Sequence, residues 1–310
     1  MNEGGHSVYG SQRAALIAQA GEQLRPELHR YCSRLTGSVI DGEEVVQDAL
    51  VRALAALDGL SELPPLRPWL FRIAHNRALD LLRSRALRAT SPIDNAHELS
   101  DDSLSDPLEL LTREEALQAA VSRFTELPLL QRSVIILKDV LDEPLAEIAE
   151  LLQLSVDSVK AHLARSRARL RELRAQAGER PQPQPASAAV ARYVAMFNQQ
   201  DWPGLRALLA DDVKLHQSTY PTRVGSADVG SFFGIYAKVE RVWLRAAWLE
   251  GREVIAVFED HATMKPSYFM RLEWSDQRLS VIRDYRYVRY VMADAELTWA
   301  QSSSDAVAGG

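Results

Sequence analysis

The most informative stretch of the chain reads SVDSVKAHLARSRARLRELR, residues 155–174. Its apolar side chains recur at helical spacing and form one stripe, which predicts an amphipathic helix. They are Val156, Val159, Leu163, Leu170 and Leu173. The remaining surface is basic, because six Lys or Arg residues oppose only Asp157 and Glu172, in a chain whose net charge is −6.

A shorter helix is expected just upstream, over residues 145–152. Gln153 and Leu154 make a tight connection, and Ser155 is a residue type that caps helix N-termini. Helix, short turn and basic helix together are the layout of a DNA-reading helix-turn-helix. The basic helix alone is also compatible with a solvated surface helix, or with a helix that binds a membrane or a protein partner.

A second basic segment lies at residues 66–88. Pro68 suits the first turn of a helix, and an inward apolar stripe follows, made of Leu70, Ile73, Ala74 and Leu81. Six arginines face only Asp80 here, and such a patch neutralises phosphates and releases counterions. Trp69, Phe71, His75 and Asn76 lie among them, and such side chains stack on or hydrogen-bond unstacked bases. The two large aromatic residues are also typical of a core, and we favour the core for Trp69.

An acidic helix is expected over residues 41–54. Val45, Ala49, Arg52 and Ala53 fall near one face, whereas Glu43, Glu44, Gln47 and Asp48 fall near another. An acidic face beside a DNA-binding patch would not touch DNA. It is therefore either solvated surface or a docking site for a basic protein partner.

The three segments, in this order and spacing, resemble a bacterial RNA polymerase sigma factor of the extracytoplasmic-function class. The resemblance covers roughly residues 12–175. It is carried by EEVVQD at 43–48, by WLFRIAHNRALDLLR at 69–83 and by the helix-turn-helix. It implies promoter DNA and core RNA polymerase as partners, the latter through its β′ clamp helices and β flap.

The resemblance also implies roles for individual residues. Polymerase would be bound by Glu43, Glu44, Gln47 and Asp48. The segment at 66–85 would open and read the promoter minus-10 element, with a base flipped into a pocket lined by Ala56, Leu60, Ile73 and Asn76. The implied minus-10 contacts are Ala56, Leu60, Trp69, Arg72, Ile73, Asn76, Arg77 and Arg83. The implied minus-35 contacts are Ser158, Lys160, Ala161, His162, Ala164, Arg165 and Arg167.

The sequence departs from the family's pattern in the helix-turn-helix. Ala161, His162 and Ala164 stand where Ser, Arg, and His or Phe are expected. Phosphate contacts and DNA shape would then carry more of the recognition. Gln153 replaces the usual turn glycine, which leaves the geometry of that turn open.

Composition bounds the remaining expectations. Hydrophobic residues make up 46 % and charged residues 25 % of the 310 positions, as in ordinary globular chains. No run reaches the roughly 18 to 20 apolar residues that span a bilayer, and no secretion signal is visible. Cys32 is the single cysteine, which excludes an intramolecular disulfide and a thiolate zinc cluster. We therefore expect a cytoplasmic protein without a metal site or cofactor.

The C-terminal third has a different composition, because five of the six tryptophans follow residue 200. Helices are expected over 189–198 and 202–209. Strands are expected over 213–216, 241–249, 253–259, 267–274 and 279–291. Helices followed by a long antiparallel meander make an α+β layout.

This third resembles a SnoaL-like domain, the cone-shaped α+β fold of polyketide cyclases and ketosteroid isomerases. The motifs are YVAMFNQQDWPGL at 193–205 and LLADDV at 208–213. Enzymes of this fold use a carboxylate or histidine in the cone as general base. The candidate ligand pocket is His216, Tyr220 and Asp284. Asp284 is also typical of an ion-paired structural carboxylate and His216 of a core histidine, so no catalytic residue is assigned.

The sequence thus predicts two all-α helical domains, the second a helix-turn-helix, followed by an α+β cone-shaped SnoaL-like domain. The predicted parts are sigma region 2 (12–88), a flexible acidic linker (89–110), sigma region 4 (111–177), a Pro-rich linker (178–188), the SnoaL-like domain (189–300) and a disordered tail (301–310). The predicted function is a non-enzymatic sigma factor whose C-terminal domain is a built-in regulator. The alternative is a small-molecule-sensing or catalytic SnoaL-like domain anchored to DNA by the helix-turn-helix. A dimeric regulator that needs no polymerase would leave the two upstream helices unexplained.

Overall fold

The computed structural model describes residues 4–88, 120–175, 183–238, 242–260 and 264–301. The predicted acidic linker, the start of the Pro-rich linker and the predicted tail beyond Gln301 lie outside these residues. The chain divides into two compact units, Met1–Gly178 and Glu179–Gly310. None of the described helices combines the length and hydropathy that a membrane span requires.

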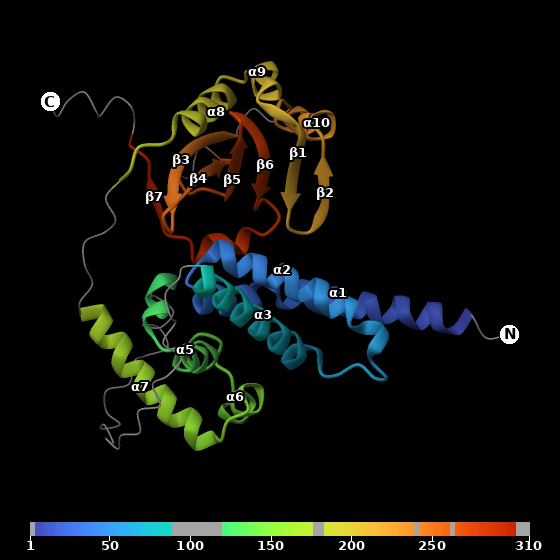
Figure 1. Ribbon diagram of the computed structural model, residues 1–310, viewed down its shortest axis with the longest axis vertical. Helices are drawn as coiled ribbons and strands as arrows, with labels where there is room; N and C mark the ends of the chain where they lie inside the picture. The colour runs from blue at the N-terminus through green and yellow to red at the C-terminus, as the bar shows by residue number, and fades with distance from the viewer. Residues whose placement is uncertain (1–3, 89–119, 176–182, 239–241, 261–263, 302–310) are drawn as a thin grey trace. The chain divides into compact units, whose positions relative to one another are not determined.

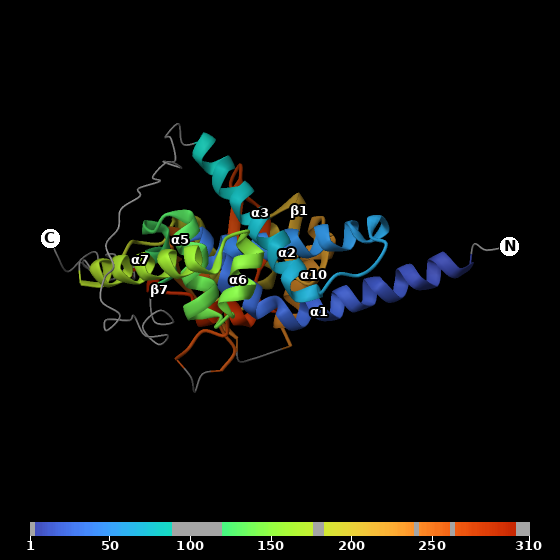
Figure 2. The same ribbon diagram turned by 90° about the horizontal axis from the view of Figure 1, so that it is seen from below.

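The first part of the N-terminal unit consists of α1 (Gly4–Thr36), α2 (Val39–Ala55) and α3 (Leu66–Arg88), which lie side by side in Figures 1 and 2. Ser38 caps α2, because its side chain accepts the backbone N–H of Asp41 at 3.1 Å. Gly42 lets α2 approach α1 closely, since a Cβ there would lie 2.6 Å from the backbone nitrogen of Ser33. Helices α2 and α3 confirm the acidic and basic helices predicted from the sequence.

The second part consists of η2 (Val121–Glu126), α5 (Leu129–Ile135), the π-helical turn η3 (Ile136–Val140), α6 (Leu145–Leu152) and α7 (Val156–Ala175). Gln153 ends α6 in the left-handed conformation, with φ 57° and ψ 44°. The turn therefore forms without the usual glycine. Ser155 caps α7, its Oγ accepting the N–H of Ser158 at 3.1 Å. The predicted helix-turn-helix is confirmed.

The two helical parts share one hydrophobic core. Leu35 of α1 and Phe124 of η2 are fully buried in it. Arg132 of α5 is 7 % exposed and donates a hydrogen bond to the carbonyl oxygen of Leu35 at 2.6 Å. Two further carbonyl oxygens, those of Thr125 and Leu127, accept from the same guanidinium at 2.8 and 3.0 Å. The two segments predicted as separate helical domains thus pack as one compact unit.

The C-terminal unit begins with α8 (Ala188–Asn198) and α9 (Trp202–Ala207). Its strands are β1 (Leu209–Gln217), β2 (Tyr220–Val224), β3 (Trp243–Leu249), β4 (Arg252–Phe258), β5 (Tyr268–Ser275), β6 (Arg278–Asp284) and β7 (Leu297–Trp299). They form one sheet in the order β2-β1-β6-β5-β4-β3-β7. Strands β3 to β6 make an antiparallel meander, whereas β1 runs parallel to β6.

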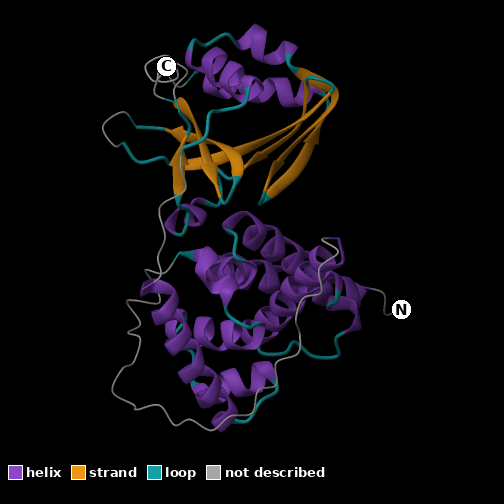
Figure 3. Cartoon of the chain, turned by 60° about the vertical axis from the view of Figure 1, so that its left-hand side comes forward, coloured by secondary structure: helices purple, strands orange, loops and turns teal. Residues whose placement is uncertain are grey.

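Helices cover one face of this sheet, which Figure 3 shows to be curved. Helix α8 packs on β3, and α10 (Ser226–Tyr236) packs on β1. The core between them holds Tyr193, Phe233 and Ile282. Gln184 and Gln301, near the two ends of the described part of this unit, lie side by side, because the backbone N–H of Gln301 donates to the carbonyl oxygen of Gln184 at 3.1 Å. The predicted α+β layout is confirmed.

Parts of the strand prediction are wrong. The strand expected over 279–291 stops at Asp284, whose side chain accepts the backbone N–H of Arg286 at 3.0 Å and so stabilises a turn. Residues 289–293 form the 3-10 helix η4 instead. Strand β2 and helix α10 were missed because β2 is largely exposed, and because the glycines and phenylalanines of α10 leave no clear polar face.

Candidate nucleic-acid interface

Helix α7 presents an outer face that carries most of the side chains predicted for the minus-35 element. Its apolar stripe is buried in the core from Val159 to Leu173, whereas Val156 in the first turn is 37 % exposed. Lys160, Ala161, Ala164 and Arg165 are exposed, whereas Ser158 and His162 are half-buried. The Nζ of Lys160 lies 3.4 Å from the exposed carboxylate of Asp157, one helical turn away. The helix thus offers a basic, solvent-facing surface of the kind that meets a DNA groove.

His162 and Arg165 form a polar pair on this face. Burial, followed by the charge of Arg165, lowers the pKa of the His162 imidazole. A neutral ring accepts through Nδ1, and Nη2 of Arg165 lies 3.3 Å from that atom. His162 therefore orients the guanidinium of Arg165 beside the helix.

Arg167 does not belong to the exposed set. Its Nε and Nη2 atoms donate to the two carboxylate oxygens of Asp139 at 2.9 and 2.6 Å. The Asp139 side chain is only 4 % exposed and comes from the π-helical turn η3. Bidentate pairing of this kind fixes both partners, so Arg167 anchors α7 to its neighbour. The sequence pattern shows its charge but not this partner, which lies on another element.

Helix α3 carries the side chains predicted for the minus-10 element. Arg72, Asn76 and Arg83 are exposed, and Trp69 is half-buried against the core. Arg77 is half-buried and paired with Asp48 of α2, as its Nε lies 2.7 Å from Oδ2. The exposed side chains leave a basic surface on α3.

The residues predicted to line a base pocket come from two places. Ala56 and Leu60 flank the 3-10 turn η1 (Leu57–Gly59), whereas Ile73 and Asn76 lie one turn apart on α3. Arg13 of α1 holds the loop after η1, donating to the carbonyl oxygens of Leu60 and its neighbour at 2.9 and 2.8 Å. Asn76 and Ala56 are exposed, and Ile73 and Leu60 are half-buried.

Two side chains considered for base stacking face inward. Phe71 is 2 % exposed and belongs to the core, as the alternative interpretation held. His75 Nδ1 lies 2.7 Å from the hydroxyl of Tyr31. Burial, then the charge of Arg83, lowers the pKa of His75 to about 4, so its ring is neutral at pH 7.

The acidic face of α2 is already partly paired with arginines of the chain itself. Glu43 is buried, and its carboxylate accepts from Arg25 at 2.8 Å. Gln47 accepts from the same guanidinium at 3.2 Å. Asp48 pairs with Arg77, although its side chain is 48 % exposed. Glu44 and Gln47 are half-buried, so the surface open to a protein partner comprises these two residues and Asp48.

The three residues of the candidate ligand pocket do not come together. Asp284 is 2 % exposed and faces the interior, whereas His216 is half-exposed on β1. His216 stands opposite Arg283, and Gln217 opposite Asp284. Because side chains alternate along a strand, His216 and Asp284 point to opposite faces. Tyr220 is 54 % exposed on β2, and its ring centre lies 4.3 Å from that of Tyr287.

Asp284 belongs to a buried polar cluster instead. Its Oδ2 accepts from Gln217 at 2.9 Å. Burial raises the pKa of Asp284 to about 6, although the hydrogen bonds from Gln217 and from the backbone of Arg286 act in the opposite direction.

Burial raises the pKa values of three tyrosines, Tyr193, Tyr236 and Tyr268, which also lie close enough for the charge of this carboxylate to raise these values further. The hydroxyls of Tyr236 and Tyr268 lie 2.6 Å apart, and burial, followed by the charge of Asp284, raises the pKa of Tyr236. The fully buried hydroxyl of Tyr193 has no hydrogen-bond partner among the described residues. Sequence reasoning missed the cluster because its members come from five different elements, β6, β1, α10, β5 and α8.

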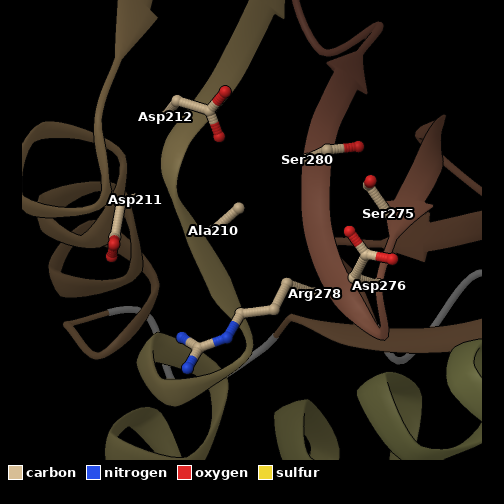
Figure 4. A pocket seen from close by; sticks show the side chains of 7 residues that line it. All are labelled: Ala210, Asp211, Asp212, Ser275, Asp276, Arg278 and Ser280. Carbon is tan, nitrogen blue, oxygen red and sulfur yellow. The ribbon is translucent and has the colours of Figure 1, made fainter.

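A polar hollow of about 510 Å³ lies elsewhere in the C-terminal unit, between the start of β1 and the β5–β6 turn (Figure 4). It is lined by Ala210, Asp211, Asp212, Ser275, Asp276, Arg278 and Ser280. It contains none of the predicted pocket residues. Within the described part of the chain, no group of three or more His, Cys, Asp or Glu side chains is arranged to hold a metal ion.

Three families match the chain in sequence: Sigma-70 region 2 over residues 22–88, Sigma-70 region 4 over 117–170 and the SnoaL-like domain over 190–290. The chain is 33 % identical to the ECF RNA polymerase sigma factor SigG of Mycobacterium tuberculosis, over 58 % of this chain and 55 % of SigG. It therefore spans about half the length of SigG.

Two further proteins are similar. The RNA polymerase sigma factor CnrH of Cupriavidus metallidurans is 32 % identical, over 53 % of this chain and 88 % of CnrH. Among solved structures, the extracytoplasmic function sigma factor SigJ of Mycobacterium tuberculosis is 21 % identical with a TM-score of 0.35, covering 90 % of this chain and 100 % of SigJ.

Proposed function

Because the chain belongs to the extracytoplasmic-function sigma factors of RNA polymerase, we propose that it binds core RNA polymerase and directs transcription initiation at specific promoters. The observation that carries this proposal is the presence of two separate basic surfaces in one compact unit. Helix α7 exposes Lys160 and Arg165, and helix α3 exposes Arg72 and Asn76. Two separate surfaces suit a protein that recognises two promoter elements.

Each surface has a proposed partner. Helix α7 would enter the major groove of the minus-35 element, and α3 would contact the single-stranded minus-10 element. Both contacts would be made in the cytoplasm. The β′ clamp helices would dock on Glu44, Gln47 and Asp48, with the β flap as a second polymerase contact. We do not include Glu43, because its carboxylate is buried against Arg25.

The proposed boundaries remain 12–88 for region 2, 111–177 for region 4 and 189–300 for the SnoaL-like domain. We propose that this last domain regulates the sigma unit. A small molecule bound to it would shift the sigma unit only if its affinity differed between the active and inactive states. The alternative of an enzyme anchored to DNA is not favoured, since His216 and Asp284 lie on opposite faces of the sheet.

In vitro transcription on a genomic promoter library with purified core RNA polymerase tests the proposal. Discrete start sites that are lost with Asn76→Ala and with Lys160→Ala would support it. A chain that lacks residues 181–310 tests the regulatory role, because unchanged promoter-specific transcription would refute it. The double variant Glu44→Lys, Asp48→Lys is expected to abolish polymerase binding. Silence of both the full and the shortened chain would overturn the sigma assignment.

A further inference from the structure

We infer that Asp48 controls the availability of Arg77 to promoter DNA, so that polymerase docking and DNA binding are coupled through one ion pair. This inference rests on the proposed function, in which Asp48 meets polymerase and Arg77 meets the minus-10 strand. Asp48 belongs to the proposed polymerase-docking face of α2, and Arg77 belongs to the proposed minus-10 face of α3.

The contact between them is short and monodentate. Both Nε and Nη2 of Arg77 lie 2.7 Å from the same oxygen, Oδ2 of Asp48. The Asp48 side chain is 48 % exposed and that of Arg77 is 25 % exposed. The carboxylate is therefore accessible to an incoming cation. The guanidinium of Arg77 can turn towards solvent when that cation replaces it at Asp48.

The other ion pairs of α2 cannot couple polymerase docking to DNA binding, because they are either buried or too weak. The carboxylates of Asp41 and Glu43, which pair with Arg85 and Arg25, are only 2 % and 3 % exposed. They are held inside the unit, where a partner protein does not reach them. Arg52 of α2 lies 3.9 Å from Asp80, and both side chains are about half exposed. That contact is too long and too exposed to hold an arginine firmly.

The coupling follows from the sharing of one charge. While Asp48 neutralises Arg77, the guanidinium contributes little to attraction of a phosphate. A basic group of polymerase that binds Asp48 removes this neutralisation, and Arg77 becomes free to contact the DNA backbone. By linkage, DNA that binds Arg77 strengthens polymerase docking on Asp48 by the same factor. Partly exposed ion pairs of this kind are worth about a two- to fivefold change in affinity.

The test uses the full chain without polymerase and a fluorescein-labelled oligo(dT) strand, because a phosphate contact does not depend on sequence. Asp48→Asn is expected to bind this strand about two- to fivefold more tightly than the wild type. The salt dependence should steepen by about 0.7 in the slope of log K against log salt, which corresponds to one added phosphate contact on a single strand. The gain should disappear in the double variant Asp48→Asn, Arg77→Gln.

Asp80→Asn is the matched control, since it removes the same charge from α3 itself, at a residue whose ion pairs with Arg52 and Arg83 are 3.9 Å long. Its effect is expected to be smaller and to persist when Arg77 is also replaced. A gain with Asp48→Asn that persists in the Arg77→Gln background would show a general charge effect and overturn the inference. Unchanged binding by Asp48→Asn would overturn it as well. Circular dichroism checks that every variant is folded.

A second arm separates this inference from the proposed function. In the assembly with core polymerase, Arg77→Gln should weaken binding of the strand by a larger factor than it does in the free chain. An equal effect in both forms would refute the coupling while leaving the sigma assignment intact. If the chain does not bind polymerase at all, the proposed function fails. The binding of oligo(dT) by the single and double variants without polymerase still shows whether Asp48 restrains Arg77.

Discussion

Arg132 donates a hydrogen bond to the carbonyl oxygen of Leu35 at 2.6 Å, although 97 positions separate the two residues. Leu35 lies in the last turn of α1, where carbonyl oxygens have no donor within their own helix. The guanidinium thus satisfies the end of one helix from another. Burial lowers the pKa of Arg132 to about 10, so the group is still charged at neutral pH.

Arg132→Met should destabilise the N-terminal unit by about 3 kcal/mol, because three carbonyl oxygens lose their donor and two of these hydrogen bonds, to Leu35 and Leu127, are buried. Urea unfolding followed by circular dichroism measures the change. Arg132→Lys keeps the charge but not the planar fork, and an intermediate loss is expected. A methionine variant as stable as the wild type would show that water replaces the guanidinium at no cost.

Asp284→Asn should stabilise the C-terminal unit at pH 7.5. The folded-state pKa is about 6 against 3.8 for the unconstrained group, so the folded chain holds the proton more tightly. The resulting stability is present at low pH and is lost as pH rises from 3.8 to about 6. The neutral amide avoids this loss of about 3 kcal/mol, but it keeps only one acceptor oxygen for Gln217 and Arg286, so we expect a net gain of about 2 kcal/mol at pH 7.5. Thermal unfolding at pH 4.5 and at pH 7.5 measures the stability difference between the variant and the wild type. An equal difference at both pH values would contradict the prediction.

His75→Asn should flatten the acid side of the stability curve. The pKa of His75 is lowered from 6.5 to about 4, so the unfolded chain binds the proton more readily. Stability from the neutral ring is full above pH 6.5 and falls as pH drops towards 4, by on the order of 3 kcal/mol. Denaturant titrations between these pH values measure the slope. An unchanged slope in the variant would mean that other groups cause the acid sensitivity.

Gln153→Gly should stabilise the helix-turn-helix by about 1 kcal/mol, because a residue with a Cβ is strained in the left-handed region. Gln153→Ala is the control, since alanine suffers the same strain and should give no gain. Thermal unfolding measures the stability of the wild type and of the two variants. Equal stability of the glycine and alanine variants would show that the side chain of Gln153 compensates for its backbone.

Lys160→Gln and Arg167→Gln should separate DNA contact from internal support on one helix. The first variant should bind duplex DNA more weakly and reduce the salt slope by about 0.9, because one phosphate contact is lost. The second leaves the buried Asp139 carboxylate without its partner and should lower stability by about 3 kcal/mol. Fluorescence anisotropy over a salt series, together with thermal melts, measures both effects. A reduced salt slope for folded Arg167→Gln would place this residue at the DNA after all.

The helices that carry the function could be predicted closely from the sequence. Helix α7 was expected from its apolar stripe, and the Ser155 cap marks its start. The pairing of Arg167 with Asp139 could not be predicted, because a charge pattern gives a residue's face but not its partner. The same holds for Arg132, whose acceptor Leu35 is remote in sequence. Contacts of this kind depend on packing, which has no local signature.

In the C-terminal unit, the meander was predictable because β3, β4 and β5 alternate or run apolar between turn residues. The end of β6 was not, because Arg286 and Tyr287 continue the strand-like composition beyond the turn at Asp284. Likewise, the sequence did not show that Asp284 points inward and His216 outward. That depends on the register between β1 and β6, which places Gln217 opposite Asp284.

The backbone contact between Gln184 and Gln301 brings together the two ends of the segment 184–301, so this segment can be moved between proteins as one module. A module whose two ends leave from one point can be inserted into a loop of another protein with little strain on either partner. It can also be permuted, with the old ends joined by a short link and new ends opened in the tight turn at Glu250 and Gly251. Gene fusion can therefore attach such a module to a helical unit while leaving both folds undisturbed.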